Sequence, residues 1–157
     1  MKTYLIHLAI LFYAVLIGCS NQSQQVKTKF PDYLPEELII RNFQESDFVA
    51  AMEIDNVSLN AEESIRDDSG NIGYAVIIYK GEIFHSYKGN LEKGRISFRH
   101  LQEYDDSLLE RLNENKMSKI VFLKKGDKTG EYIAPEFSIF NYSEELHEAL
   151  VDYAEKQ

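Results

Sequence analysis

The segment that most constrains the fold is residues 72–79, with the sequence Ile-Gly-Tyr-Ala-Val-Ile-Ile-Tyr. β-branched and aromatic side chains dominate this segment, and none of its residues is charged. Such a run is typical of a central strand that is buried on both faces. Lys80-Gly81 then predicts a tight turn into a second strand over residues 82–87, so the pair is expected to form a β-hairpin.

Further extended segments surround this hairpin. Gly89-Asn90 and Lys93-Gly94 bracket a turn, and residues 62–71 are predicted to form a polar, acidic loop. Pro135 limits the start of the last extended segment to an edge or a bulge. The additional strands are predicted at residues 37–43, 48–55, 95–98, 119–124 and 132–142.

Two segments have apolar residues at helical spacing. Residues 108–115 follow Asp105, Asp106 and Ser107, which can cap a helix. The final helix is predicted to begin after Ser143, and one apolar stripe of it comprises Leu146, Ala149, Leu150, Tyr153 and Ala154. Together these elements predict an α+β fold. We expect a small, mostly antiparallel sheet of about five to seven short strands, packed by two helices, the last one C-terminal.

The N-terminus has the pattern of an export signal. Met1 and Lys2 give a positive end, and fourteen mostly apolar residues, 4–17, follow it. This stretch is shorter than the roughly 20 residues that a transmembrane helix requires, and its order fits a secretion signal. It ends in Leu16-Ile17-Gly18-Cys19, which resembles the lipobox of bacterial lipoproteins. The resemblance implies cleavage between Gly18 and Cys19, a diacylglycerol on the Cys19 thiol, and usually a third acyl chain on its amino group.

An unlipidated secretory peptide is the alternative interpretation, but Cys19 is the only cysteine and has no intramolecular disulfide partner. A polar stretch over residues 20–25 follows it at once, as in a tethered chain. We therefore interpret residues 1–18 as a lipoprotein signal peptide and residues 19–30 as the lipidated cysteine with a flexible tether. Residues 31–157 are then a single α+β domain. About ten flexible residues reach roughly 15–20 Å.

The resemblance also implies a location. Two or more acyl chains hold a protein on a bilayer almost permanently, so Cys19 would fix the chain to a membrane of the cell envelope. Ser20 after the cysteine indicates the periplasmic face of the outer membrane if the host has two membranes. Otherwise the outer face of the plasma membrane is expected.

The net charge of the chain limits the classes of molecule that it is expected to bind. Loss of residues 1–18 removes only Lys2 from the charge count, so the mature chain has a formal net charge of −10. This balance argues against binding to nucleic acid or close contact with anionic lipid. It favours a soluble acidic surface and a basic protein partner. Glu62, Glu63, Asp67 and Asp68, together with the aromatic Tyr33, are the candidate contacts.

Three segments resemble motifs for metal binding, catalysis or phosphate binding, but each departs from its motif at a required position. His147-Glu148 begins like a zinc-protease helix, but Val151 stands where the second histidine belongs. Residues 67–71 offer oxygen ligands for calcium, but Ile72 occupies the position of the glycine that such a loop needs. Asp127 likewise stands before Lys128-Thr129, where a phosphate loop has glycine. The sequence therefore predicts no catalytic residue, metal ligand or cofactor.

Three functions remain open. The first is a membrane-tethered, non-catalytic protein-binding domain, for example an immunity-type inhibitor of a toxin. The second is a structural accessory subunit of an envelope or secretion machine, which a large exposed apolar patch would favour. The third is an envelope hydrolase that uses His85 or His100 with a carboxylate, which a histidine hydrogen-bonded to Asp or Glu in a pocket would favour.

Overall fold

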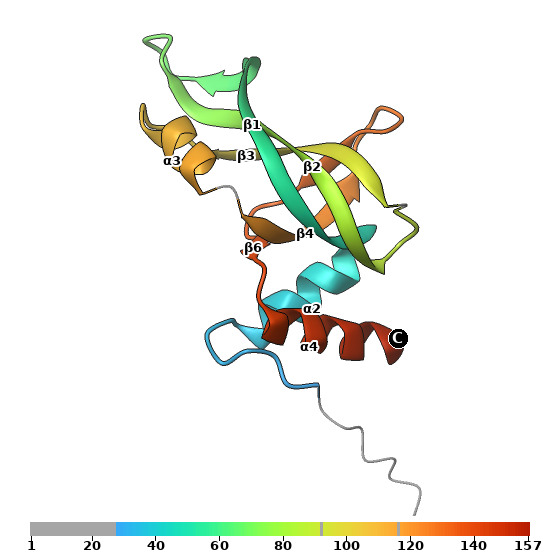
Figure 1. The fold of residues 1–157 in the computed structure, drawn as a ribbon. Helices are drawn as coiled ribbons and strands as arrows, with labels where there is room; N and C mark the ends of the chain where they lie inside the picture. Colours follow the sequence, from blue (N-terminus) through green and yellow to red (C-terminus); the bar gives the residue numbers. More distant parts are fainter. Residues whose placement is uncertain (1–27, 92, 116) are drawn as a thin grey trace, which may run out of the picture.

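The computed structural model describes residues 28–157, apart from residues 92 and 116 (Figure 1). The elements are α2 (Glu36–Glu45), β1 (Phe48–Arg66), β2 (Ile72–Lys88), β3 (Gly94–Glu103), α3 (Leu108–Glu114), β4 (Ser118–Lys125), β5 (Tyr132–Ala134), β6 (Ile139–Asn141) and α4 (Glu144–Glu155). The sheet has six strands and is mostly antiparallel, and α4 is C-terminal. The predicted α+β fold is confirmed.

The sheet closes on itself. β1 pairs with β2 along one edge and with β4 along the other, and β3 joins the ring through a short parallel pairing with β5. β5 in turn pairs with β4, so β1, β2, β3, β5 and β4 form a small barrel, and β6 pairs with β4 beside it. Closure of this kind removes the exposed sheet edges that the paired strands would otherwise have.

Two apolar cores lie on the two faces of the β1–β4 pair. Along β1, Ala50 and Met52 belong to the core inside the barrel, whereas Val49 and Ala51 belong to a second core under the helices. β4 alternates in the same way, with Val121 inside and Phe122 outside. Because both faces of these strands are covered, their sequences are apolar at successive positions.

The second core is covered by α2 and α4, which lie next to each other below the barrel (Figure 1). Residues 37–43 are therefore helical, and the prediction of a strand there was wrong. Ile39 and Phe43 are one helical turn apart and both are buried in this core. The described residues thus contain three helices where the sequence predicted two.

The predicted position of the hairpin turn was also wrong. β2 continues through Lys80-Gly81 to Lys88, and residues 62–66, predicted as loop, belong to β1. The turn of the long β1–β2 hairpin lies at residues 67–71, where Gly70 has a φ of +85°. The predictions of strands at residues 48–55, 95–98 and 119–124 and of helices at residues 108–115 and after Ser143 are confirmed within one or two residues or as parts of longer elements.

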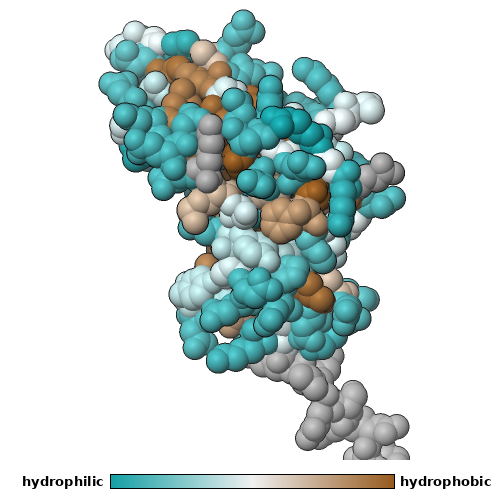
Figure 2. Space-filling view, viewed as in Figure 1, coloured by the Kyte–Doolittle hydropathy of each residue, from teal (hydrophilic) through white to brown (hydrophobic). Residues whose placement is uncertain are grey.

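The two ends of the molecule differ. Thr28, which donates to Asp152 of α4, lies with α2 and α4 at one end, and the turn of the β1–β2 hairpin lies at the other (Figure 1). On the face shown in Figure 2, hydrophobic side chains gather at the hairpin end, whereas the helical end is mostly hydrophilic. Within residues 28–157, apart from 92 and 116, no helix is long and apolar enough to cross a bilayer.

Candidate interaction surface

A row of apolar side chains lies uncovered on the outside of the barrel. Strand alternation directs Ala75 and Ile77 of β2 into the core, so Tyr74 faces outward. The ladder sets Tyr74 opposite Ile65 of β1, and Leu101 of β3 follows on the same face. Ile65, Tyr74 and Leu101 are 53%, 51% and 45% exposed. The predicted strand over residues 72–79 is therefore not buried on both faces throughout its length.

This row continues into two adjoining hollows, which together we call the outer groove. The first, of about 420 Å³, is lined in part by Ile65, Leu101 and Ile133. The second, of about 600 Å³, shares Leu101 and Ile133 and adds Tyr74 and Phe137. The groove forms because the β3–β5 ladder comprises only two residue pairs, after which Pro135 carries the chain away from β3.

Phe137 is 64% exposed, more than the other exposed apolar side chains of the outer groove, Ile65, Tyr74 and Leu101. Its φ of +56° lies in the left-handed region, which bulky residues rarely occupy. Two hydrogen bonds hold this segment: Asn42 Nδ2 donates to the Phe137 carbonyl at 2.7 Å, and Ser138 Oγ donates to the Pro135 carbonyl at 2.5 Å. The fold therefore maintains a strained backbone that presents an aromatic ring to solvent.

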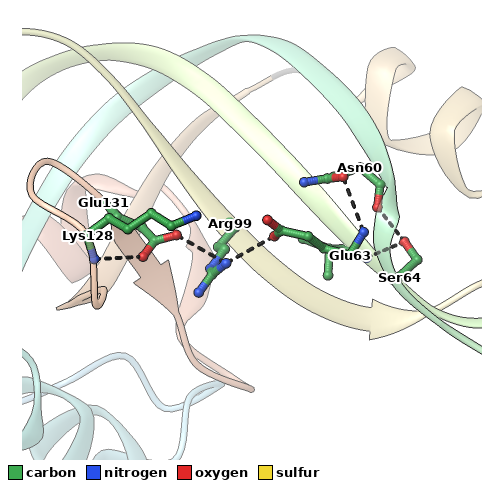
Figure 3. Close-up of polar contacts among 7 residues, drawn as sticks. Asn60, Glu63, Ser64, Arg99, Lys128 and Glu131 are labelled. Carbon is green, nitrogen blue, oxygen red and sulfur yellow. Dashed lines mark hydrogen bonds and ion pairs between the residues drawn. The ribbon is translucent and has the colours of Figure 1, made fainter.

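An arginine lies between two carboxylates on the same face of the sheet (Figure 3). Arg99 Nη1 of β3 is 3.0 Å from Glu63 Oε2 and 3.1 Å from Glu131 Oε1. Glu131 Oε2 also accepts from the Lys128 backbone N–H at 3.3 Å. Arg99 thus ties β1 to the segment that leads into β5, across the floor of the groove. Arg99 and Glu131 are half-buried and Glu63 is exposed, and ion pairs at a protein surface each contribute at most about 1 kcal/mol to stability.

A bulge in β1 positions Glu63. The β1–β2 register jumps between the pairs Asn60↔Val76 and Ile65↔Tyr74, which leaves extra residues on β1. Ser64 Oγ closes the bulge by donating to the Asn60 carbonyl at 2.7 Å and accepting from the Val76 N–H at 3.0 Å. Bulges redirect side chains, and here the bulge brings the Glu63 carboxylate toward Arg99 (Figure 3).

The polar residues around the groove are mainly acidic. Glu103 and Glu136 line the larger hollow, Glu63 lines the smaller one, and Glu131 lies beside them. Arg99 is the cation that lines the smaller hollow. The arrangement is an apolar floor with an acidic rim.

The structure separates the residues predicted to contact a partner. Glu62, Glu63, Asp67 and Asp68 lie along or at the turn of the β1–β2 hairpin. Tyr33 lies at the opposite end, where it is 63% exposed and its hydroxyl is 2.7 Å from Ser143 Oγ.

Of the four acidic residues, Glu63 is the one that lines the groove, and Glu62 and Asp68 are exposed. Asp67 organises the turn, because its Oδ1 accepts the backbone N–H groups of Ser69 and Asn71, each at 2.9 Å. The Asn71 N–H bond above all lowers the pKa of Asp67. Gly18 and Cys19 lie outside the described residues.

The histidines form no acid–base pair with a carboxylate in the described part of the chain. His147 Nδ1 is 2.7 Å from the Tyr87 hydroxyl, and the His85 ring lies 4.8 Å from that of His147. Burial, followed by the positive charges of His147 and Lys93, lowers the pKa of His85. His100 Nδ1 donates to the Ala134 carbonyl at 2.8 Å. Residues 28–157, with 92 and 116 set aside, hold no metal-binding group of three or more His, Cys, Asp or Glu.

No protein-family model and no curated protein matches this chain. Sequence reasoning identified Glu63 but missed Ile65, Tyr74, Leu101 and Phe137. Residues 72–79 are apolar at nearly every position, so the sequence does not show which face of β2 remains uncovered.

Proposed function

We propose that this chain is a lipid-anchored protein of a bacterial cell envelope that binds a basic protein partner through the outer groove. The observation that carries the proposal is Phe137, an exposed aromatic residue in a left-handed backbone conformation beside the exposed Tyr74 and Leu101. A strained, exposed aromatic anchor in an apolar groove is the kind of residue that dominates binding energy at interfaces.

The charge of the rim supports the choice of a basic partner. Glu63, Glu103, Glu131 and Glu136 surround the groove, and the chain as a whole has a formal net charge of −9. Complementary charge speeds the encounter of two proteins and excludes acidic competitors. A non-catalytic inhibitor, including the immunity type that neutralises a toxin, would use such a surface to capture its target.

The position of the chain entry supports a tethered arrangement. With Cys19 as the lipid anchor, the chain would enter the domain at Thr28, whose hydroxyl donates to Asp152 of α4 at 2.7 Å. The turn of the β1–β2 hairpin lies at the other end of the molecule (Figure 1). The hairpin end of the groove would then point away from the bilayer, where a soluble partner can reach it.

Site-specific photocrosslinking in intact cells tests the proposed surface. A photoreactive residue is placed at Leu101 or Phe137 in the groove, and at the exposed positions Glu37 or Asp127 as controls. We expect an adduct of one defined mass from both groove positions and not from the controls. Adducts of equal yield from all four positions, or none from the groove, would contradict the proposal.

An accessory subunit of an envelope machine is the second candidate, and the row Ile65, Tyr74 and Leu101 favours it, since exposed apolar patches also mark permanent interfaces. The two candidates differ in how much of the protein is bound to its partner in the cell. A permanent subunit would co-purify from membranes with its partner at a fixed ratio. An inhibitor would do so only when its target is present.

A further inference from the structure

The barrel has a hollow at one end, beneath α3. Its volume is about 410 Å³, and we call it the barrel mouth. Its apolar lining includes Val57 of β1 and Leu108 and Leu112 of α3, and its polar lining includes Tyr79 and Lys119. Figure 2 shows hydrophobic side chains at this end of the molecule, over β1, β2 and α3. Mouths of β-barrels are common sites for small ligands, and this volume is within the usual range.

Lys119 brings a positive charge to this apolar space. Strand alternation places Lys119 on the same face of β4 as Val121 and Leu123, both of which belong to the core inside the barrel. Lys119 Nζ donates to Asn141 Oδ1 at 2.6 Å. Within the part of the chain that the structure describes, no carboxylate lies within ion-pair distance of it. Partial burial lowers its pKa.

Lys119 lines the mouth without a carboxylate partner, although acidic residues outnumber basic ones in the chain by 26 to 17. The other basic residue of the mouth, Arg111, is already paired with Asp105 at 2.7 Å. The hydroxyl of Tyr79 is only weakly engaged, at 3.5 Å from Gln102 Oε1. An opposite charge stabilises a partly buried cation, so an anionic ligand group in the mouth would find a partner in Lys119.

We propose that the barrel mouth binds a small amphipathic carboxylate. Its carboxylate pairs with Lys119, and its apolar body lies against Val57, Leu108 and Leu112. A single cation matches a monoanion, whereas a dianionic phosphate requires several donors around it. The mostly apolar lining requires a hydrocarbon body of matching size. The mouth shares the lining residues His100 and Gln102 with the outer groove, but this inference does not depend on the proposed function.

Ligand-observed NMR titrations of the full chain in lipid nanodiscs test this site, with empty nanodiscs as the blank. The probes are 3-phenylpropanoate and its neutral analogue 3-phenylpropanamide, which share one apolar body. We expect the native protein to bind the acid more tightly than the amide. Lys119→Met should raise the Kd of the acid by roughly tenfold or more, since it removes a hydrogen bond between charged groups. Its effect on the amide should be small.

Three further variants control for folding and for general charge effects. Lys119→Arg keeps the charge and should keep binding. Lys124→Met removes an exposed cation from the same strand, one that is paired with Glu45 at 3.8 Å, and should leave the Kd unchanged. Leu112→Glu places a carboxylate in the mouth and should weaken binding of the acid more than that of the amide. Equal affinity of the native protein for both probes, no binding at all, or an unchanged Kd in Lys119→Met would overturn the proposal.

Discussion

At Gly81 the backbones of β1 and β2 approach so closely that a side chain does not fit. A Cβ atom there would overlap the Glu53 carbonyl oxygen and lie 3.0 Å from the Ile54 Cα. Lys80-Gly81 has the composition of a turn, yet β2 runs straight through it. The glycine is needed for close approach between strands, which is a tertiary requirement that sequence alone does not reveal.

Gly81→Ala should therefore destabilise the fold. We expect the free energy of unfolding to fall by about 1–3 kcal/mol, the usual cost of overpacking a core. Urea unfolding followed by circular dichroism measures this change. Gly73→Ala is the matched control in the same strand, because nothing lies within 4 Å of a Cβ built there. The two variants should differ clearly, and equal stabilities would contradict this account.

Phe137 should contribute to binding at the expense of stability. Asparagine tolerates a positive φ better than phenylalanine, so Phe137→Asn should relieve strain of about 1 kcal/mol and leave the Tm unchanged or higher. The same variant should lose the crosslinking partner captured at Leu101. Thermal unfolding and crosslinking are measured on the same preparation. A large fall in Tm would show that the ring supports the fold instead.

His85 should make the fold sensitive to mild acid. Burial lowers its pKa in the folded protein, so between about pH 6.5 and that lowered pKa the unfolded chain binds more protons. The free energy of unfolding should therefore fall as the pH drops through this interval. Urea unfolding at pH values of about 7 and 5 measures the loss, which His85→Gln should reduce. An unchanged pH dependence in the variant would exclude His85 as the source.

Among the elements, α4 has the best-defined start. The Ser143 hydroxyl accepts the Leu146 backbone N–H at 3.2 Å, which caps one of the otherwise unpaired donors of the first turn. Ser143→Ala should lower the free energy of unfolding by about 1 kcal/mol, measured by urea unfolding. Tyr33→Phe is the control, because the Tyr33 hydroxyl also contacts the Ser143 hydroxyl and its loss shows how much of the change comes from that contact. If Tyr33→Phe alone reproduces the loss, the cap is not the cause.

The accuracy of element prediction followed the strength of local signals. Ser143 and the apolar stripe of α4 are contiguous in sequence, so the helix was predicted correctly. α2 was missed, although Pro35 and two acidic residues precede its buried pair Ile39 and Phe43. Adjacent Ile39-Ile40 favoured a strand by propensity. The segment is helical because Ile39 and Phe43 pack in one core with α4, and this burial outweighs the weak intrinsic preference of isoleucine for strands.

At the scale of the whole molecule, the anchor can be tested directly. Cells fed a palmitate analogue should label the native chain, and Cys19→Ala should lose the label and leave the membrane fraction, because the remaining chain lacks the acyl groups that hold it on the bilayer. Mass spectrometry of the purified protein checks the product. Retention of residue 1, or an unmodified Cys19 thiol, would contradict the lipobox interpretation and the proposed location together.

The candidate surface was predictable only in part. Acidity was visible in the sequence, and Glu63 was identified from it, but Tyr33 lies at the other end of the molecule. The aromatic and aliphatic residues of the groove come from β1, β2, β3 and the segment around β5, which are far apart in the chain. Their proximity depends on strand pairing across the barrel. No local pattern encodes that order.

The amino-acid sequence alone determined the elements with strong local signals, such as α4, because capping residues and the spacing of apolar side chains act within a few positions of the chain. It also determined the excess of acidic charge. Tertiary structure decided the closure of the barrel, the cover of one face by α2 and α4, and the exposure of Tyr74, Leu101 and Phe137. Alternation specifies which residues share a face, but only long-range packing specifies whether that face is covered.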